Sequence, residues 1–289
     1  MEHSIPASRW RALRSNNLGV MIAIAFIVAI VTVSIFAPFF APFNPNQQHL
    51  AARLKPPGFT LAGSGKMFVL GSDHLGRDIL SRIIFGSRIS LFVGIVSVAL
   101  TAVIGTVLGL VAGFMRGMFD TVIMRLVDLT LSIPSMLLAL AVIGIIGSGI
   151  TNLIVVILVT RWARYARVQY GQVCSYSQRE FVQAAYSIGC KKSRIIFRHL
   201  LPNLASTTIV LATLDLGFTI IFESGLSFLG LGAPPSVPTW GGMLAEGRAY
   251  LSTAWWLGTF PGIAIMITVL GFNLLGDWLR DRFDPTVGN

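Results

Sequence analysis

Long apolar stretches separated by short charged segments dominate the pattern of this chain. The clearest stretches cover residues 18–40, 89–115, 129–160, 204–229 and 255–275. A helix that crosses the hydrocarbon core of a bilayer needs about 20 consecutive, mostly apolar residues, and each stretch reaches that length. The pattern therefore predicts an all-α polytopic membrane protein with charged segments on either side of the membrane.

The stretch 129–160 is too long for one comfortable membrane helix and short for two. The sequence Gly147-Ser148-Gly149 favours a break, because glycine and serine are typical of turns. Charge points the same way: the segment 161–198 holds eight Lys and Arg residues and only Glu180 as an acid. The positive-inside tendency places such a segment in the cytoplasm, on the same side as the basic N-terminus, only if the stretch forms two helices. We therefore predict six transmembrane helices with both termini cytoplasmic.

These spans divide the chain into segments. The first apolar stretch is longer than the roughly 7 to 15 apolar residues of a signal peptide, so we expect an uncleaved helix. The outer connection and the residue directly after it carry six cationic residues, an unusual number for the outer side of a membrane protein: Arg53, Lys55, Lys66, Arg77, Arg82 and Arg88. The predicted segments are a cytoplasmic N-terminus (1–17), the first transmembrane helix (18–40), an outer connection (41–87), a five-helix core (88–278) with a cytoplasmic loop at 170–202, and a cytoplasmic tail (279–289).

Composition excludes a soluble globular domain. Of the 289 residues, 54% are hydrophobic and 12% are charged, whereas soluble domains average about 25% charged residues. The formal net charge of +10 would suggest nucleic-acid binding in a soluble protein, but here the positive-inside tendency explains it and we expect no nucleic-acid partner. Cys174 and Cys190 lie in the basic segment, which we expect to be cytoplasmic, so we interpret them as reduced.

No pattern of catalytic or metal-binding residues emerges. The four histidines, His3, His49, His74 and His199, have no ligand spacing between them, so we predict no metal site. Gly63-Ser64-Gly65-Lys66 resembles the end of a phosphate-binding loop, but the required earlier glycine and the following Ser or Thr are missing. We therefore expect neither a catalytic residue nor a cofactor in this chain.

Small residues recur every four positions in the second apolar stretch. Such a stripe lies along one face of a helix and lets another helix approach closely. We predict helix packing along this stripe, which comprises Ser97, Thr101, Gly105, Gly109 and Gly113.

Three acids lie in or near the apolar stretches, where an unpaired charge is costly enough to suggest a function. For Asp128 we favour an ion pair with Arg125, one helical turn earlier. Asp215 falls near mid-membrane at a rise of about 1.5 Å per residue, and Glu223 falls nearer the outer mouth. Both are candidates for lining a translocation pathway, and a buried hydrogen bond to another helix is an equal alternative for each.

In the segment 180–202 the sequence predicts two short helices. Gly189 separates them, and Pro202 marks the end of the second. Phe181, Val182, Ala185 and Tyr186 form an apolar face on the first helix. Physical reasoning leaves open whether such a helix lies on lipid headgroups or fits a groove on another protein.

The spacing in this segment resembles the signature cytoplasmic loop of ABC importer permeases. Ala184-Ala185, Gly189 and Leu201-Pro202 match the usual pattern, whereas Gln183 replaces its glutamate and His199 its isoleucine. Glu180 fits the oligopeptide branch. Three further segments, 70–82, 226–241 and 273–285, look like the second permease subunit of the dipeptide, oligopeptide and nickel importers, so the resemblance covers nearly the whole chain.

The resemblance implies a type I importer permease (MetI-like) fold in a bacterial inner membrane, with the outer connection in the periplasm. It implies pairing with a homologous permease, two ATP-binding subunits that use ATP and Mg²⁺, and a periplasmic or lipid-anchored substrate-binding protein. The residues implied to couple the chain to the ATP-binding subunits are Glu180, Gln183, Ala184, Ala185, Gly189, Leu201 and Pro202.

Dipeptides or oligopeptides are the expected cargo, with nickel, glutathione and opines as alternatives within the family. A secondary transporter or channel is the main alternative of another class. It predicts ion-coupling acids in interrupted helices and an inverted repeat, and no convincing repeat is visible. A membrane scaffold is a third alternative, supported by the glycine stripe alone.

Overall fold

The computed structural model describes residues 17–61 and 65–283. The predicted N-terminal segment 1–17, except Asn17, and the end of the predicted tail 279–289 lie outside the described residues. Two short strands, β1 (Phe59–Thr60) and β2 (Met67–Phe68), pair antiparallel. The helical elements are α2 (Asn17–Ile35), α3 (Ala37–Phe40), η1 (Leu50–Ala52), α4 (Ile79–Met115), α5 (Met118–Ser132), α6 (Ser135–Ile146), α7 (Ile150–Ser177), α8 (Glu180–Ser187), α9 (Lys192–Ile195), η2 (Ile196–Leu200), α10 (Leu201–Phe228), α11 (Trp240–Gly247), η3 (Arg248–Tyr250) and α12 (Trp256–Phe283).

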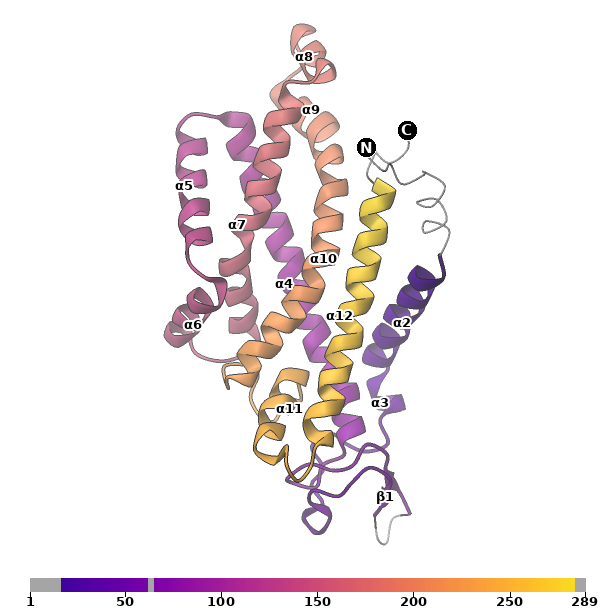
Figure 1. Cartoon of the computed structure of the whole chain (residues 1–289). Coiled ribbons are helices and arrows are strands. Elements are labelled where there is room, and N and C mark those ends of the chain that lie inside the picture. The colour runs from indigo at the N-terminus through magenta and orange to yellow at the C-terminus, as the bar shows by residue number, and fades with distance from the viewer. Residues whose placement is uncertain (1–16, 62–64, 284–289) are drawn as a thin grey trace, which may run out of the picture.

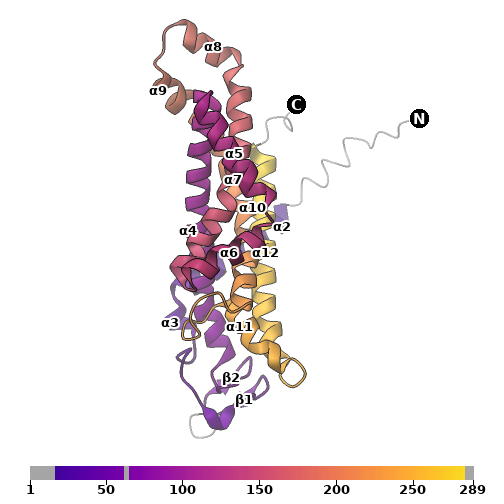
Figure 2. The ribbon, with the colours of Figure 1, turned by 90° about the vertical axis from the view of Figure 1, so that its left-hand side faces the viewer.

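The long helices form an elongated bundle (Figure 1). Helices α4, α7 and α12 run from the end that carries the β-strands and α11 towards the end that carries α8, and α10 runs back. Helix α4 packs against α7, α10 packs against α12 and α4, and α2 packs against α12. Figure 2 shows α8 and α9 arching over one end of the bundle, while the strands lie at the other.

Three described helices are long and apolar enough to cross a membrane by themselves: α4, the continuous helix Lys192–Phe228, and α12. The pair α5 and α6 passes the same test jointly but is bent by 98°. Helix α2 is apolar and shorter, and α7 carries Arg161, Arg164 and Arg167 in its body. The six predicted spans correspond in order to α2–α3, α4, α5–α6, α7, α10 and α12.

The stretch 129–160 breaks where the glycines predict it, because α6 ends at Ile146 and α7 begins at Ile150. Gly147 and Gly149 have positive φ angles of 84° and 146°, which glycine tolerates best. A second break was not predicted. Pro134 excludes the helical conformation from the preceding residue, and Ile133 is extended with φ −96° and ψ 130°.

Two helix boundaries differ from the predicted segments. Helix α5 starts at Met118, eleven positions before the apolar stretch that predicted it. Helix α4 starts at Ile79, so the end of the predicted connection 41–87 is helical. The Asp78 side chain caps α4 by accepting a hydrogen bond from the Ser81 amide at 2.7 Å. Apolar content predicts only the apolar part of a helix. The charged ends of α4 and α5 therefore lay outside the predicted helices.

The glycine stripe of α4 faces α7. A Cβ atom added at Gly105 would lie 2.6 Å from the Trp162 carbonyl oxygen, and one added at Gly109 would lie 2.5 Å from that of Ala166. A Cβ atom at Gly113 would meet Val173 at 2.9 Å. The two backbones therefore approach as closely as glycine allows.

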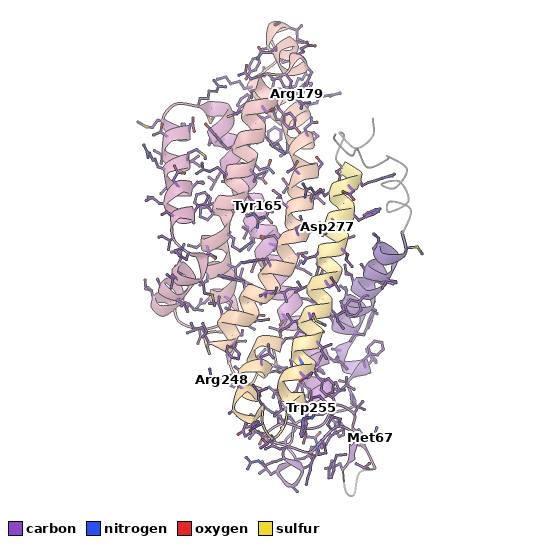
Figure 3. All side chains as sticks on the ribbon, in the orientation of Figure 1. Met67, Tyr165, Arg179, Arg248, Trp255 and Asp277 are labelled. Atoms are coloured by element: carbon purple, nitrogen blue, oxygen red, sulfur yellow. The ribbon has the colours of Figure 1, made fainter. Side chains whose placement is uncertain are left out.

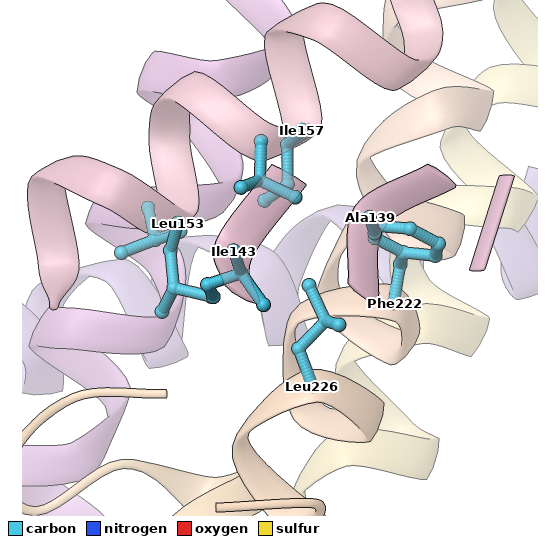
Figure 4. Packing of buried hydrophobic residues seen from close by; sticks show 8 residues of the cluster. Ala139, Ile143, Leu153, Ile157, Phe222 and Leu226 are labelled. Carbon is cyan, nitrogen blue, oxygen red and sulfur yellow. The ribbon is translucent and has the colours of Figure 1, made fainter. Parts of the chain in front are cut away.

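An apolar cluster joins the bent pair to the rest of the bundle (Figure 4). Buried side chains from α6, α7 and α10 meet there. This contact packs α6 against α7 and α10, although the chain bends between α5 and α6. The labelled members are Ala139, Ile143, Leu153, Ile157, Phe222 and Leu226.

Candidate functional site

The cytoplasmic loop predicted at 170–202 begins later than expected, because α7 continues to Ser177. Helix α8 ends at Ser187, and Gly189, two residues later, has a positive φ of 77° where the chain turns away from the helix. Val182 and Ala185 are buried and pack with Val173 of α7, Leu110 of α4 and Leu204 of α10, in a cluster that also holds Ile195 and Leu200. Three long helices thus hold α8 at the end of the bundle.

The sequence predicted that the second short helix of the loop ends at Pro202. In the structure this helix continues past Pro202. Helix α9 continues through the π-helical segment η2 into α10, and Lys192–Phe228 forms one helix. The Leu201 amide donates to the carbonyl of Ile196, five residues earlier. A proline ring inside a regular helix clashes with a carbonyl four residues back, and the wider π turn accommodates Pro202. The loop is therefore joined to α10 without a flexible connection.

The seven signature residues divide between the surface and the core. Glu180, Gln183, Ala184, Gly189 and Pro202 are exposed, Leu201 is half-buried, and Ala185 is buried. The Gln183 amide nitrogen donates to the Ser177 carbonyl at 2.7 Å, so it ties α8 to the end of α7. Ala185 therefore belongs to the packing of the loop itself, whereas Ala184 and Gly189 face outward.

The outer surface of the loop is apolar and basic. Ile188 and Phe197 are 79% and 69% exposed, and both line a hollow of about 700 Å³ that Lys191 and Arg194 also border. The segment 178–200 holds five basic residues, Arg179, Lys191, Lys192, Arg194 and Arg198, against the single acid Glu180. Large apolar side chains that are exposed side by side, as Ile188 and Phe197 are, are typical of an interaction surface.

Asp215 is buried in the middle of the bundle and forms an ion pair. Arg161 of α7 binds it through Nη2 to Oδ1 and through Nε to Oδ2 at 3.3 Å. The Tyr165 hydroxyl donates to Oδ2 at 3.2 Å, and Tyr165 lies near the middle of the bundle in Figure 3. Arg161 therefore belongs to the helix bundle, although its charge was counted with the basic segment 161–198 that was expected in the cytoplasm.

Glu223 is fully buried and is bound by hydroxyl groups. Ser227 donates to its Oε1 at 2.7 Å, while Ser90 of α4 and Ser224 lie 3.4 and 3.5 Å from Oε2. The two alternatives for Asp215 and Glu223 were a place lining the pathway and a buried hydrogen bond to another helix. In the structure each carboxylate makes such a hydrogen bond. Neither carboxylate is open to a passing solute in this conformation.

The predicted pair between Asp128 and Arg125 is wrong. Asp128 of α5 binds Arg167 of α7, and both side chains are about half exposed, at 54% and 45%. Helices α5 and α7 pack against each other, which brings together two residues far apart in the sequence. The helical spacing offered a local partner and could not reveal the one across the interface.

A buried network of ions lies at the opposite end, where the matched segment 70–82 meets α11. Arg82 binds Asp73 at 2.6 Å and Glu246 at 2.6 Å, and Arg77 binds the same two acids at 2.5 and 2.8 Å. Burial by itself would raise the pKa of Asp73, but the Arg82 and Arg77 guanidinium groups and two backbone amides hold that pKa below its ordinary value. The sequence signalled this site only through the family resemblance.

The same network accounts for part of the unusual outer charge. Arg77 and Arg82 are neutralised by the two acids, and Arg53 donates to the His74 carbonyl at 2.6 Å. Asp73, His74 and Glu246 also lie close enough together to hold a metal ion. Arg77 and Arg82 already bind both carboxylates, however, and two guanidinium groups repel a cation, so we interpret the cluster as an ion-pair network.

A helix bundle with a basic, apolar loop rigidly attached to one of its helices matches a known family. Residues 105–289 match the family described as "Binding-protein-dependent transport system inner membrane component". The chain belongs to this family of transport permeases. Residues 7–57 match the "N-terminal TM domain of oligopeptide transport permease C", so the permease also resembles that branch of the family at its N-terminal end.

Relatives match the permease over nearly its full length. The di/tripeptide transport system permease protein DppC of Pseudomonas aeruginosa (strain UCBPP-PA14) is 40% identical over 280 residues, which cover 97% of this chain and 92% of the relative. The glutathione transport system permease protein GsiD of Pectobacterium atrosepticum is 39% identical, with 96% and 89% covered. The permease is therefore a membrane-embedded transport subunit.

Solved importers share the fold of the permease. An inward-facing structure of the MetNI methionine ABC transporter matches with a TM-score of 0.55 at 18% identity, covering 70% of this chain and 96% of that one. An amino acid ABC transporter solved with histidines matches with a TM-score of 0.55 at 12% identity, covering 70% and 94%. The permease thus has the all-helical MetI-like fold.

Proposed function

We propose that the chain is one of two homologous permease subunits of an ATP-driven importer for dipeptides and oligopeptides in a bacterial inner membrane. Its partners are the second permease, two ATP-binding subunits that use ATP and Mg²⁺, and a periplasmic or lipid-anchored substrate-binding protein. The hydrolytic chemistry belongs to the ATP-binding subunits, so this chain needs no cofactor or catalytic residue. Relatives named for dipeptide and di/tripeptide transport support a peptide cargo.

In the proposed topology, α2–α3, α4, α5–α6, α7, α10 and α12 are the six membrane passages. The start of α2 and the end of α12 lie towards the α8 end of the bundle (Figure 1), which supports placing both termini on the side of the basic loop. That side is the cytoplasm by the positive-inside tendency. The β-strands and α11 then lie in the periplasm, facing the substrate-binding protein.

The observation that carries the proposal is the unbroken helix from Lys192 to Phe228. A force applied to the outer surface of the loop is transmitted to α10 without a hinge, and Asp215 and Glu223 connect α10 to α7 and α4. A groove on each ATP-binding subunit would take the exposed apolar side chains of the loop, as amphipathic helices do in grooves of other proteins. ATP binding would then tilt α10 and change the access of the pathway.

Co-purification tests the proposal. We expect the tagged chain, expressed with its neighbouring transport genes, to recover a second permease and the ATP-binding subunits. Ala184→Trp should abolish recovery of the ATP-binding subunits and leave the second permease bound, because Ala184 faces outward. Ala51→Trp is the matched control: Ala51 is also exposed, lies in η1 at the opposite end, and should change nothing.

Transport by the chain alone separates the proposal from a secondary transporter. Liposomes that contain only this chain should take up no peptide, with or without an ion gradient. Uptake in the absence of ATP-binding subunits would refute the importer assignment.

A further inference from the structure

The middle of the bundle carries one surplus positive charge. Arg161 and Asp215 neutralise each other through two hydrogen bonds, and the Arg161 guanidinium also stacks on the ring of Phe218, 4.1 Å from its centroid. Arg164 is a second arginine beside the same carboxylate, with its Nη1 3.8 Å from Asp215 Oδ1. Because Arg161 already binds both carboxylate oxygens, two arginines share one acid here, and among the described residues this leaves one positive charge in excess.

Arg164 differs from Arg161 in its access to the surroundings. Its side chain is 56% exposed, against 8% for Arg161 and 3% for Asp215. Yet Arg164 lies at the midpoint of the 28-residue helix α7, opposite the midpoint of α10. In a membrane passage this is the depth at which an arginine exposed to lipid is most costly. The exposed guanidinium therefore faces water or an anion rather than hydrocarbon.

The neighbouring surface supports water at this depth. The exposed side chains in the first half of α7 include Val155 and Val159, whereas those in the second half include Arg164 and Arg167. Arg167 is paired with Asp128 of α5, and both are about half exposed. The charged, accessible side chains of α7 thus lie in the half of the helix nearer the α8 end, and Arg164 is the one closest to the middle of the bundle.

We propose that Arg164 binds the carboxylate of the cargo midway along the translocation pathway, so that the pathway favours peptides with a free C-terminal carboxylate over cations. The inference rests on the proposed function and specifies the chemistry of its substrate. A guanidinium presents two parallel N–H donors that match a carboxylate. The surplus positive charge at the same point repels a divalent metal ion, which makes nickel the least suitable cargo of this family for this chain.

The test uses the complete transporter, with partner permease, ATP-binding subunits and binding protein, reconstituted in liposomes with ATP inside. Uptake of a labelled dipeptide is measured at a saturating concentration of loaded binding protein. We expect Arg164→Gln to lower the uptake rate about tenfold or more, because a charge-assisted hydrogen bond to the cargo is lost. Arg164→Lys should recover most of the rate, and both variants should assemble and hydrolyse ATP like the unmodified complex.

Each result decides the question. Unchanged uptake by Arg164→Gln would overturn the role of Arg164 and leave the importer function standing. Loss of the second permease from Arg164→Gln would overturn it as well, since Arg164 would then hold an acid of the partner. An unmodified complex that carries no peptide would refute the proposed function and this inference together.

Water access is tested separately, after Cys174 and Cys190 are replaced by serine. A charged, membrane-impermeant thiol reagent applied from the α8 side should label Arg164→Cys in the complete complex. Val159→Cys, in the apolar half of α7, is the matched control and should stay unlabelled from that side. An Arg164→Cys variant that resists the reagent in every nucleotide state would place position 164 away from the pathway and overturn the proposal.

Discussion

Asp215→Asn removes the negative charge that faces Arg161 in the middle of the bundle. Both side chains are more than nine-tenths buried, so the variant leaves a buried guanidinium without its counter-ion. Removing one partner of a buried ion pair costs about 3–5 kcal/mol, much more than the pair itself contributes. Asp128→Asn is the matched comparison, because its pair with Arg167 is about half exposed and such pairs contribute about 0–1 kcal/mol.

The assay is the thermal midpoint of the purified complex, followed by size-exclusion chromatography after heating. A loss of 1 kcal/mol corresponds to roughly 2–4 °C for proteins of about this size, so Asp215→Asn should lower the midpoint by at least about 6 °C and Asp128→Asn by less than about 4 °C. The double variant Arg161→Met, Asp215→Leu removes both charges and should recover most of the loss. Equal midpoints for Asp215→Asn and the unmodified complex would refute the reasoning that the buried Arg161 guanidinium requires its counter-ion.

Two further predictions follow from the packing and the outer network. Gly109→Val should separate α4 from α7 and abolish recovery of folded, monodisperse protein, whereas Gly144→Val should be tolerated because a Cβ atom at Gly144 meets nothing within 4 Å; normal yield of the Gly109 variant would contradict the close approach. The lowered pKa of Asp73 stabilises the fold fully above pH about 4, where the unfolded carboxyl is ionised, and this stabilisation is lost as the pH falls through the lower pKa of the folded state. Asp73→Asn should therefore be less stable at neutral pH, and its difference from the unmodified protein in thermal midpoint should shrink on acidification; a difference that stays constant with pH would exclude the ionised carboxylate as the cause.

The spacing of the loop motif located the coupling segment but did not orient its side chains. Ala184 and Ala185 are adjacent in the motif, yet only Ala185 packs against α4, α7 and α10. Helical periodicity shows that two adjacent residues point in different directions, but which direction is the core depends on where the long helices lie. Pro202 shows the same limit, because a π turn absorbs a residue that ordinarily marks a helix boundary.

The sequence predicted which acids lie within the apolar stretches, but their partners became known only from the structure. Asp215 and Glu223 stood out because acids are rare in apolar stretches, and the expected alternatives included a buried hydrogen bond. Arg161 and Arg164 escaped notice because they were counted with the basic segment 161–198, which was expected to lie in the cytoplasm. Helix α7 continues past residue 160, where the predicted apolar stretch ends, so both arginines lie on a helix of the bundle.

The sequence by itself determined that this is an all-helical membrane protein of the importer permease family, because apolar length, the basic loop and motif spacing are local properties of the chain. Only the tertiary structure decided which arginine faces which acid, how closely α4 approaches α7, and that the loop and α10 form one continuous helix. The physical reason is that ion pairing and close packing depend on distances between residues far apart in the sequence, such as Arg77 and Glu246, which are separated by 169 positions. The pattern along the chain encodes burial, and the partners of a buried group are set by the packing of helices against one another.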